Sequence, residues 1–579
     1  MITKKGINAS PGVAIGTALV LDAEDYRIPR RTVDPGQIPA QISVLDNALE
    51  TSRAEVAELR VAAARKVGDQ AGDIFRFHEG LIGDRRLRES VAELITNHRN
   101  TAAYAFSQIM GQRQKEFRAL NDPYLKERVR DLHDIERRVL RHILGRQRED
   151  IANLSEPVIV FAHDLTPSQA VSIDRKHVLG FAIDVGGQTS HTAILVRMMD
   201  IPSVIALNDA TSDVTGGETV IVDGVHGIVV INPDEATLER YRAQQREYRE
   251  FVVRLNRLRD LPSVTRDDVR IQLFANIELA DEAEAALEAG AEGVGLYRTE
   301  FLFLSRTRPP SEDEQYESYR RAAESLKGKP LVIRTMDLGA DKMSFSMGMQ
   351  HDPNPDLGLR SLRYCLQHLD LFKTHLRAIL RAGVHGDVRI MFPMITTPME
   401  LRQARATLAD VMEDLDEEGI SFRRDIKIGI MVETPAAAIM AASLARDVHF
   451  MSIGTNDLTE YTLAVDRGNE RVAHLYAPHS PAVLRLIRSV LRGGARISLP
   501  VNICGEMAGS PVYCQLLIGL GLRHLSMTPK DIPEIKRIVR SSTIAECRAV
   551  AREALRFDSD RQVLNFLRDE LRKLNDDPL

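Results

Sequence analysis

Eight short apolar segments alternate with helical patterns along residues 263–579, and this alternation is the strongest constraint on how the chain can fold. Strands that alternate with helices predict β-α units joined into a parallel sheet. Eight such units are the number that closes a (β/α)8 TIM barrel, here somewhat longer than the usual ~250 residues. We therefore predict a TIM barrel over residues 263–579, with strands at Val269–Ile277, Gly293–Glu300, Pro330–Asp337, Val388–Ile395, Ile426–Thr434, Phe450–Asp457, Pro500–Glu506 and His524–Thr528.

Polar and reactive side chains lie at or near the C-terminal ends of most of these predicted strands. They are Asn276, Arg298, Arg334, Asp337, Glu433, Asn456, Asp457 and Cys504. Taken singly, each could be a helix cap or one half of a surface ion pair. In a barrel, however, the C-terminal ends of all strands converge on one rim, where active sites lie. The shared position predicts one functional site built from these residues.

The residue types at this predicted rim indicate which ligands it binds. Glu433 and Asp457 supply two carboxylates, which is how Mg²⁺ is usually held when water and substrate oxygens complete its shell. Guanidinium groups suit phosphate and carboxylate, and four are available at Arg298, Arg334, Arg360 and Arg467. The combination predicts a small substrate that carries both a phosphate and a metal-binding group.

Cys504 has two interpretations from sequence alone. A lone cysteine is most often a small buried apolar residue. At a strand end beside cations it could instead act as a proton donor.

The first 262 residues change character three times. Residues 1–21 contain short β-type segments with glycine turns, and β character returns over residues 149–232. Between them, residues 22–148 carry apolar side chains at helical spacing, with charges on the other faces. The simplest account is one α/β domain into which an α-helical domain is inserted. Residues 233–262 then form a polar linker helix, and a helix this polar usually bridges two bodies through solvent.

One segment of the α/β domain, Gly186–Leu195, holds a candidate nucleophile. A strand, a glycine turn and a helix start place His191 near a helix N-terminus, where the dipole and backbone N–H groups favour a negative group. Imidazole is a proton carrier at neutral pH and a competent nucleophile. A packed histidine preceded by the helix caps Thr189 and Ser190 is the alternative.

Composition excludes several classes of protein. A formal net charge of −6 argues against nucleic-acid binding and against attachment to a membrane surface. The four cysteines show no Cys-x-x-Cys spacing, which suits a reducing compartment and argues against a structural zinc site. No apolar run is long enough to span a bilayer. We therefore expect a cytoplasmic protein.

Several separate motifs closely resemble enzyme I of the phosphoenolpyruvate:sugar phosphotransferase system, and the resemblance covers essentially the whole chain. The motifs are Gly6–Gly16, Tyr124–Arg128, Gly186–Ile194, Gly293–Phe303, Met431–Ala437, Ser452–Arg467 and Ile503–Gly509. The resemblance implies that residues 1–21 and 149–232 form a swivelling phosphohistidine domain. It also implies that residues 22–148 bind the phosphocarrier protein HPr, and that the barrel binds phosphoenolpyruvate and forms a homodimer.

The resemblance also implies a role for each candidate residue. His191 would be phosphorylated by phosphoenolpyruvate and would pass the phosphoryl group to HPr. Glu433 and Asp457 would hold Mg²⁺, and Cys504 would protonate the enolate carbon to give pyruvate. The substrate would be bound by Arg298, Arg334, Arg360, Asn456, Asp457 and Arg467.

The chain departs from the family pattern in three places. Gln188 stands where the family usually has arginine, which removes a cation beside His191. Ala340 replaces a usual glycine, and the following residues 343–352 are unlike the family loop. Asp356 and Leu359 stand where the family has phenylalanine and tryptophan. None of these changes removes a catalytic group, so they bear on rates and on HPr specificity.

The sequence also leaves three alternative functions to consider. Pyruvate phosphate dikinase and phosphoenolpyruvate synthase share the histidine domain and the barrel, but the region before His191 shows no glycine-rich nucleotide loop. The nitrogen-branch form of enzyme I usually carries an N-terminal sensory domain. A regulatory phosphoprotein that merely senses phosphoenolpyruvate would not need Glu433, Asp457 and Cys504 together.

Overall fold

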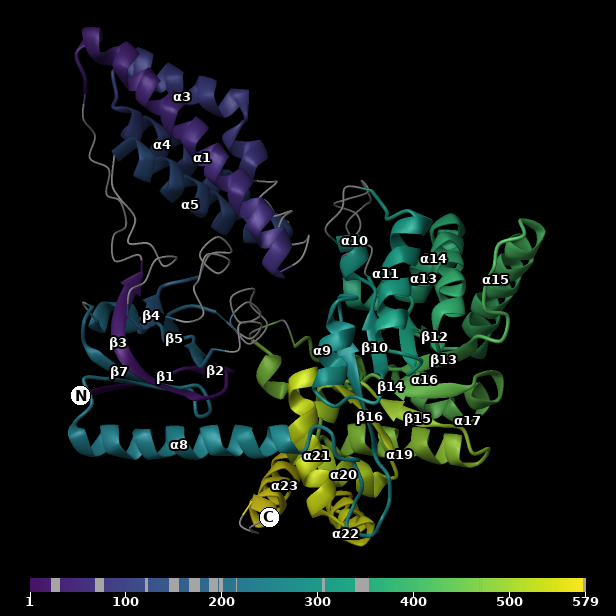
Figure 1. Ribbon diagram of the computed structural model, residues 1–579. Helices are drawn as coiled ribbons and strands as arrows, with labels where there is room; N and C mark the ends of the chain where they lie inside the picture. The colour runs from purple at the N-terminus through teal and green to yellow at the C-terminus, as the bar shows by residue number, and fades with distance from the viewer. Residues whose placement is uncertain are drawn as a thin grey trace. The chain divides into compact units, whose positions relative to one another are not determined.

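The chain is seen in a computed structural model (Figure 1). It describes residues 1–21, 32–67, 78–119, 123–144, 156–165, 177–186, 196, 201–214, 216–304, 308–338, 354–467, 469 and 471–575. The chain divides into two compact units, unit 1 from Met1 to Phe251 and unit 2 from Val252 to Leu579.

Unit 1 contains one eight-stranded sheet in the order β1-β8-β7-β3-β4-β5-β6-β2. Its strands are β1 (Ile2–Lys5), β2 (Ile7–Ser10), β3 (Val13–Leu21), β4 (Val158–Ala162), β5 (Val178–Ile183), β6 (Ser203–Ile205), β7 (Thr219–Asp223) and β8 (Ile228–Ile231). Strand β3 pairs in parallel with β4, from Thr17 opposite Val158 to Leu21 opposite Ala162. Segments on both sides of the helical region therefore share one sheet, which confirms the predicted split α/β domain.

Strands β4 and β5 are apolar along their whole length because both faces of the sheet are covered there. In β4, Val160 packs in one hydrophobic cluster, whereas Ile159 and Phe161 pack in another. Successive side chains of a strand point to opposite faces, so the two clusters lie on opposite sides of the sheet.

The helical region of unit 1 contains α1 (Ile38–Val67), α3 (Arg85–His98), α4 (Ala102–Ala119) and α5 (Pro123–Leu144), which lie alongside one another (Figure 1). Their apolar residues meet in a single core that includes Leu45, Val56, Leu87, Phe106 and Ile135. Helix α3 begins where the Asp84 side chain accepts a hydrogen bond from the backbone N–H of Arg86. The predicted helical insertion is confirmed.

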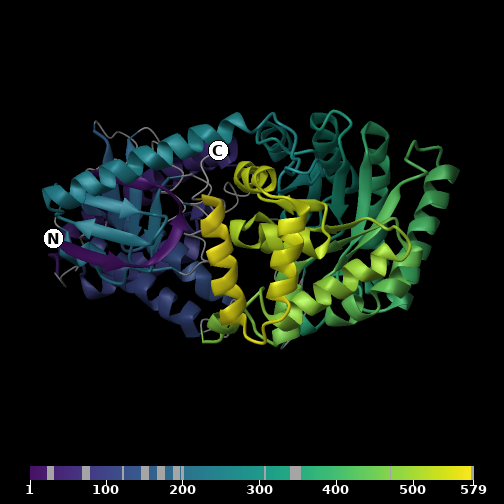
Figure 2. The ribbon, with the colours of Figure 1, turned by 90° about the horizontal axis from the view of Figure 1, so that it is seen from below.

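Helix α8 (Glu235–Arg257) corresponds to the predicted polar linker. Its N-terminal half does not run through solvent as expected, because Tyr241 is buried against Val13, Ile221 and Val230 of the sheet. Figure 2 shows α8 alongside the strands. The few apolar residues of this helix are therefore enough to anchor its first half to the α/β domain.

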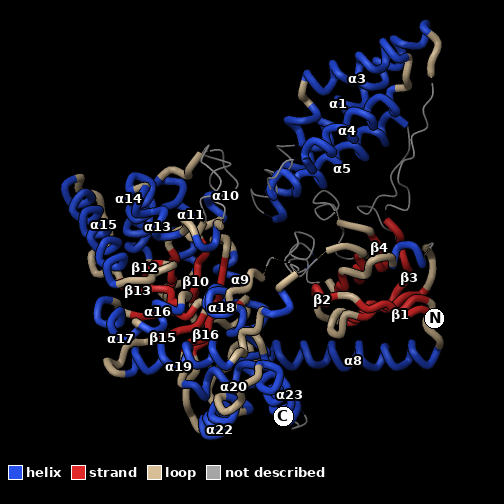
Figure 3. The backbone as a smooth tube through the Cα atoms, turned by 180° about the vertical axis from the view of Figure 1, so that it is seen from behind, coloured by secondary structure: helices blue, strands red, loops and turns tan. Residues whose placement is uncertain are grey.

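Unit 2 contains a closed barrel of eight parallel strands in the order β9 to β16 (Figure 3). They are β9 (Gln272–Ile277), β10 (Val294–Arg298), β11 (Leu331–Arg334), β12 (Val388–Phe392), β13 (Lys427–Val432), β14 (Phe450–Ile453), β15 (Val501–Ile503) and β16 (His524–Met527). Each lies inside one predicted strand, so the TIM barrel is confirmed.

Helices surround the strands and supply the other half of the barrel core. They are α9 (Glu282–Glu288), α10 (Phe301–Leu304), α11 (Glu312–Ser325), α13 (Ser361–Gln367), α14 (Leu369–Ala382), α15 (Pro398–Glu417), α16 (Pro435–Ile439), α17 (Ala441–Leu444), α18 (Thr455–Leu463), α19 (Pro481–Ala495), α20 (Pro511–Leu520), α21 (Ile532–Ser541), α22 (Ile544–Ala554) and α23 (Asp560–Asn575). None of the helices in the described ranges is both long enough and apolar enough to cross a membrane.

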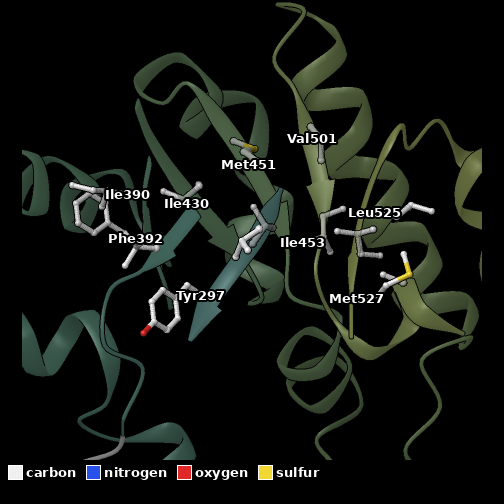
Figure 4. Close-up of a cluster of buried hydrophobic side chains, with 14 of the residues drawn as sticks. Tyr297, Ile390, Phe392, Ile430, Met451, Ile453, Val501, Leu525 and Met527 are labelled. Carbon is white, nitrogen blue, oxygen red and sulfur yellow. The ribbon is translucent and has the colours of Figure 1, made fainter. Parts of the chain in front are cut away.

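Residues along one barrel strand alternate between two clusters. Ile390 and Phe392 of β12 pack in the large core with the surrounding helices (Figure 4). Met391, between them, belongs to a smaller cluster with Met431 and Cys504. The smaller cluster fills the barrel interior, because alternate side chains of a barrel strand point inward. Cys504, which directly follows β15, therefore lies at the C-terminal end of the interior packing.

Candidate active site at the C-terminal end of the barrel

Four predicted residues occupy equivalent positions on different strands. Arg298 is the last residue of β10 and Arg334 is the last residue of β11. Glu433 directly follows β13, and Cys504 directly follows β15. The strands are parallel, so these side chains share one end of the barrel, as predicted.

Asn456 and Asp457 differ from the prediction, which placed both on a strand running from Phe450 to Asp457. Strand β14 ends at Ile453, and both residues lie in the first turn of α18. The chain leaves the strand at Gly454, where a Cβ would come within 3.0 Å of the Glu433 carboxylate. The glycine thus lets the backbone pass close to Glu433.

Arg334 lies at the centre of a buried ionic network. Its Nη1 is 2.8 Å from Oδ2 of Asp337, and its Nη2 is 3.1 Å from Oε1 of Glu300. Burial lowers the pKa of Arg334, but Glu300 and Asp337 more than offset this and raise it. The Nε of Arg334 is buried without a hydrogen-bond partner among the described residues. The Arg334 side chain is thus held in place by two carboxylates.

Arg360, the N-cap residue of α13, joins two acidic groups. Its Nη2 lies 3.0 Å from Asp337 and its Nη1 lies 3.3 Å from Asp457. The Ser361 hydroxyl also donates to Asp337. Burial raises the pKa of the Asp337 carboxyl, but Arg334 and Arg360 together bring it well below its usual range. Asp337 is therefore an ionised anchor for both arginines.

Glu433 is fully buried and only half satisfied. Its Oε1 accepts a hydrogen bond of 2.6 Å from the backbone N–H of Met394. Its Oε2 has no hydrogen-bond partner among the described residues. Burial raises the pKa of Glu433, and the neighbouring carboxylates of Asp457 and Asp337 raise it further. Such a cluster of acids favours a bound cation.

Among the described residues, Glu433 and Asp457 are the two carboxylates that this site can offer a metal. Across the described ranges, no three His, Cys, Asp or Glu side chains are grouped so that they could hold a metal ion. A hard cation at Glu433 and Asp457 would take its remaining oxygens from substrate and water, which is the usual arrangement for Mg²⁺.

Glu506 links Arg467 to Asn456. Its Oε1 accepts hydrogen bonds from Nη1 of Arg467 at 3.1 Å and from Nδ2 of Asn456 at 3.2 Å. Its backbone N–H donates to Oδ1 of Asn456 at 3.0 Å. The Arg467 side chain is 37% exposed. The Arg467 guanidinium is thus oriented by a neighbour and still open to a ligand.

Cys504 is buried, and its thiol stays protonated at neutral pH. Its side chain is 2% exposed and packs with Met431 and Met391. Burial raises the pKa of Cys504 to about 11. The thiol can therefore carry a proton to a substrate atom placed above the barrel interior.

Arg298 and Asn276 complete the predicted set. The Arg298 guanidinium donates to Glu278 at 2.9 Å and is 34% exposed. Asn276 donates to the backbone carbonyl of Cys504 at 2.9 Å, and its own oxygen accepts from the Ser526 hydroxyl. Asn276 thus supports the segment that carries Cys504.

His191 lies outside the described residues, as do Gln188 and Ala340. The strand expected before His191 is present as β5, and Gly186 follows it with φ of 118°, in the region that favours glycine.

Two acidic residues of the site carried no predicted role. Glu300 balances Arg334 and accepts a hydrogen bond from the backbone N–H of Asp337 at 2.8 Å. Glu506 orients Asn456 and Arg467. Each follows a strand end by two or three residues, so the strand-end rule applied to Arg298 and Cys504 would have found both.

Models of three protein-family regions match the chain in order. Residues 5–128 match the N-terminal region of PEP-utilising enzymes, residues 154–227 match their mobile domain, and residues 253–544 match their PEP-binding domain. The last match spans the barrel strands and every site residue described above.

Three relatives are similar over nearly their whole length, and each is named phosphoenolpyruvate-protein phosphotransferase. The protein from Priestia megaterium is 39% identical over 97% of this chain and 98% of its own. The Geobacillus stearothermophilus protein is 40% identical over 98% of both chains. The Bacillus subtilis protein is 37% identical over 98% of this chain and 99% of its own. The chain therefore belongs to the phosphoenolpyruvate-protein phosphotransferase family of PEP-utilising enzymes.

Proposed function

We propose that the barrel end binds phosphoenolpyruvate and that His191 takes its phosphoryl group, releasing pyruvate. The phosphohistidine then passes the group to a histidine of HPr, the first step of the sugar phosphotransferase system. The observation that carries the proposal is the convergence of Arg334 and Arg360 with the carboxylates of Glu433 and Asp457. This set provides cations for a phosphate and acids for a metal in one place.

Five side chains bind the substrate in this proposal. Phosphoryl transfer depends mostly on positioning and on neutralising charge, which guanidinium groups supply. The side chains of Arg298 and Arg467 are 34% and 37% exposed, so their guanidinium groups are available donors. The complete set is Arg298, Arg334, Arg360, Asn456 and Arg467, with Asp457 shared with the metal.

Mg²⁺ is the metal that fits Glu433 and Asp457. The unpaired Oε2 of Glu433 and the mutual repulsion of the two carboxylates are what a hard divalent cation would relieve. When bound, Mg²⁺ would neutralise charge on the substrate and orient its oxygens. Asp337 and Arg360 keep Asp457 in place.

Cys504 is the proposed proton donor to the enolate carbon that remains after phosphoryl transfer. Its thiol is protonated and lies at the C-terminal end of the barrel interior. Its backbone carbonyl accepts a hydrogen bond from Asn276, which holds this strand end in place. A group that keeps its proton until substrate arrives can act as a general acid.

His191 must travel between donor and acceptor in this mechanism. It belongs to the α/β domain in unit 1, whereas phosphoenolpyruvate would bind in unit 2, and α8 carries the boundary between the units. We propose that this domain swivels, that HPr docks on the helical domain of residues 22–148, and that the barrels pair into a homodimer.

The proposal predicts that phosphoenolpyruvate labelled with ³²P, with Mg²⁺ alone, labels the wild-type protein. Phosphohistidine is labile in acid, so the label should be lost in acid and kept in alkali. The His191→Ala variant should take up no label, because its nucleophile is gone. His226→Ala, at an exposed histidine of the same domain, is the matched control and should label normally. Label that survives in His191→Ala would refute the proposal, and ATP-dependent labelling would favour the dikinase.

Adding HPr tests the transfer step. Labelled protein should lose its phosphoryl group to HPr within the same incubation. Retention of the label would favour the regulatory phosphoprotein. The full-length similarity to the relatives named above favours the sugar branch over the nitrogen branch.

Cys504→Ser should slow pyruvate formation by about 10²-fold or more, the usual contribution of a general acid. Binding of phosphoenolpyruvate should stay nearly unchanged, because serine keeps the size and the neutrality of the thiol. Cys514→Ser is the matched control, since Cys514 is equally buried but lies in α20 away from the site. Rates are measured by coupled pyruvate detection. An unchanged rate in Cys504→Ser would leave Cys504 with a packing role only.

A further inference from the structure

A large cavity lies at the opposite end of the barrel from the active site. It has a volume of about 920 Å³ and is lined by α19, by the turn between α20 and β16, and by one face of α22. The residues that begin β15 and β16, Val501 and His524, are part of its wall. Figures 1 and 3 both show α20 and α22 together on this side of the barrel. The cavity is therefore separate from the phosphoenolpyruvate site.

The charge of this cavity is entirely of one sign. Six arginines contribute to the described lining, and no aspartate or glutamate does: Arg488, Arg492, Arg523, Arg548, Arg552 and Arg556. In a smaller cavity beside it, by contrast, a lining arginine is neutralised, because Arg389 is paired with Asp387 at 2.5 Å.

Four of the six arginines have no neutralising partner among the described residues. Arg523 donates to the backbone carbonyls of Ile518 and Leu522, and Arg556 pairs with Glu553 at 3.0 Å. The other four make no side-chain hydrogen bond or ion pair within the described ranges of the chain: Arg488, Arg492, Arg548 and Arg552.

The spacing of these arginines destabilises the protein when the cavity holds no ligand. Arg488 and Arg492 are four residues apart on α19, and Arg548 and Arg552 repeat that spacing on α22. Like charges at this spacing destabilise a helix. Positions in the last helical turn, which favour cations, account for Arg492 and Arg552 but not for the other two. A bound polyanion would turn the repulsion into attraction.

The uncharged residues of the wall indicate which other groups a negatively charged ligand of this cavity would carry. Leucines from each lining element face the cavity, at Leu491, Leu499, Leu520 and Leu555. A site of this volume is large enough for a compound of nucleotide size. Guanidinium groups bind phosphate through paired N–H donors.

We propose that this cavity binds a small organic polyphosphate, with at least two phosphate groups against the arginines and an apolar or aromatic body against the leucines. A nucleoside di- or triphosphate has this chemistry. The site is additional to the proposed phosphotransfer and does not depend on it.

The test is calorimetric titration of the full chain with ATP, in chelator and at low salt so that the phosphates stay free and the charges unscreened. We expect saturable binding of ATP, weaker binding of tripolyphosphate and none of adenosine. The Arg548→Gln/Arg552→Gln variant should bind ATP at least about tenfold more weakly, because two phosphate-binding donors are lost. The matched control, Arg561→Gln/Arg568→Gln, removes the same charge from α23, outside the cavity, and should bind normally.

Equal loss in both double variants, or no binding of ATP beyond that of orthophosphate, would overturn the proposal. Tripolyphosphate that binds as tightly as ATP would show that the role given to the leucines is wrong. Labelling of His191 by phosphoenolpyruvate should be unchanged in Arg548→Gln/Arg552→Gln. This readout confirms that the variant is folded and separates the outcome from that of the proposed phosphotransfer.

Discussion

Replacing Arg334 with methionine is expected to reduce phosphoenolpyruvate-dependent phosphorylation by about 10³-fold or more, the range found when an arginine is removed from a phosphoryl-transfer site. It should also lower the free energy of unfolding by about 3–5 kcal/mol, the usual cost of removing one partner from a buried ion pair. Both effects have the same cause, since Arg334 is the counter-charge of Glu300 and Asp337. Urea unfolding and initial rates of labelling measure the two effects separately.

A second variant separates loss of binding from loss of fold. Arg334→Lys keeps the positive charge beside Asp337, so its stability should be closer to that of the wild type. Its activity should still fall strongly, because an ammonium group cannot make the paired contacts of a guanidinium. Arg389→Met, at the other end of the barrel, is the matched control for losing a barrel arginine and should retain activity. A wild-type rate in Arg334→Lys would show that phosphorylation does not require the guanidinium geometry of Arg334.

Glu433→Gln is expected to abolish phosphorylation while making the metal-free protein more stable to heat. The activity should be lost because an amide is a much poorer ligand for Mg²⁺ than a carboxylate. The stability should rise because the buried Glu433 is destabilised by burial and by Asp457 and Asp337. Thermal unfolding in chelator measures the second effect.

Adding Mg²⁺ provides the decisive comparison. The wild type should gain thermal stability with Mg²⁺, since a ligand that binds the folded state stabilises it, whereas Glu433→Gln should not. Glu417→Gln, at an exposed position of α15, is the matched control and should behave like the wild type in both tests. Equal stabilisation of Glu433→Gln by Mg²⁺ would remove Glu433 from the metal site.

The barrel and the split α/β domain could be predicted from sequence because their signals are local. Each strand from β9 to β16 is a short apolar run between helical segments, and eight is the number of such units in a TIM barrel. The predicted end of the strand Phe450–Asp457 is wrong, because the chain turns into α18 at Gly454, three residues before the expected end. The prediction that α8 runs through solvent is also wrong for its first half. Its sequence does not show that Tyr241 packs against a sheet.

The sequence by itself determined which side chains stand at the barrel end, because strand ends are set by local pattern. Only the tertiary structure decided how those side chains are paired. Arg360 and Asp457 are 97 residues apart in the chain, and their contact exists because the fold brings the N-cap residue of α13 to the first turn of α18. The unpaired Oε2 of Glu433 and the unpaired arginines of the opposite cavity have the same origin. Whether a charged group has a partner depends on which other groups the fold brings near it. The spacing of residues along the chain does not contain this information.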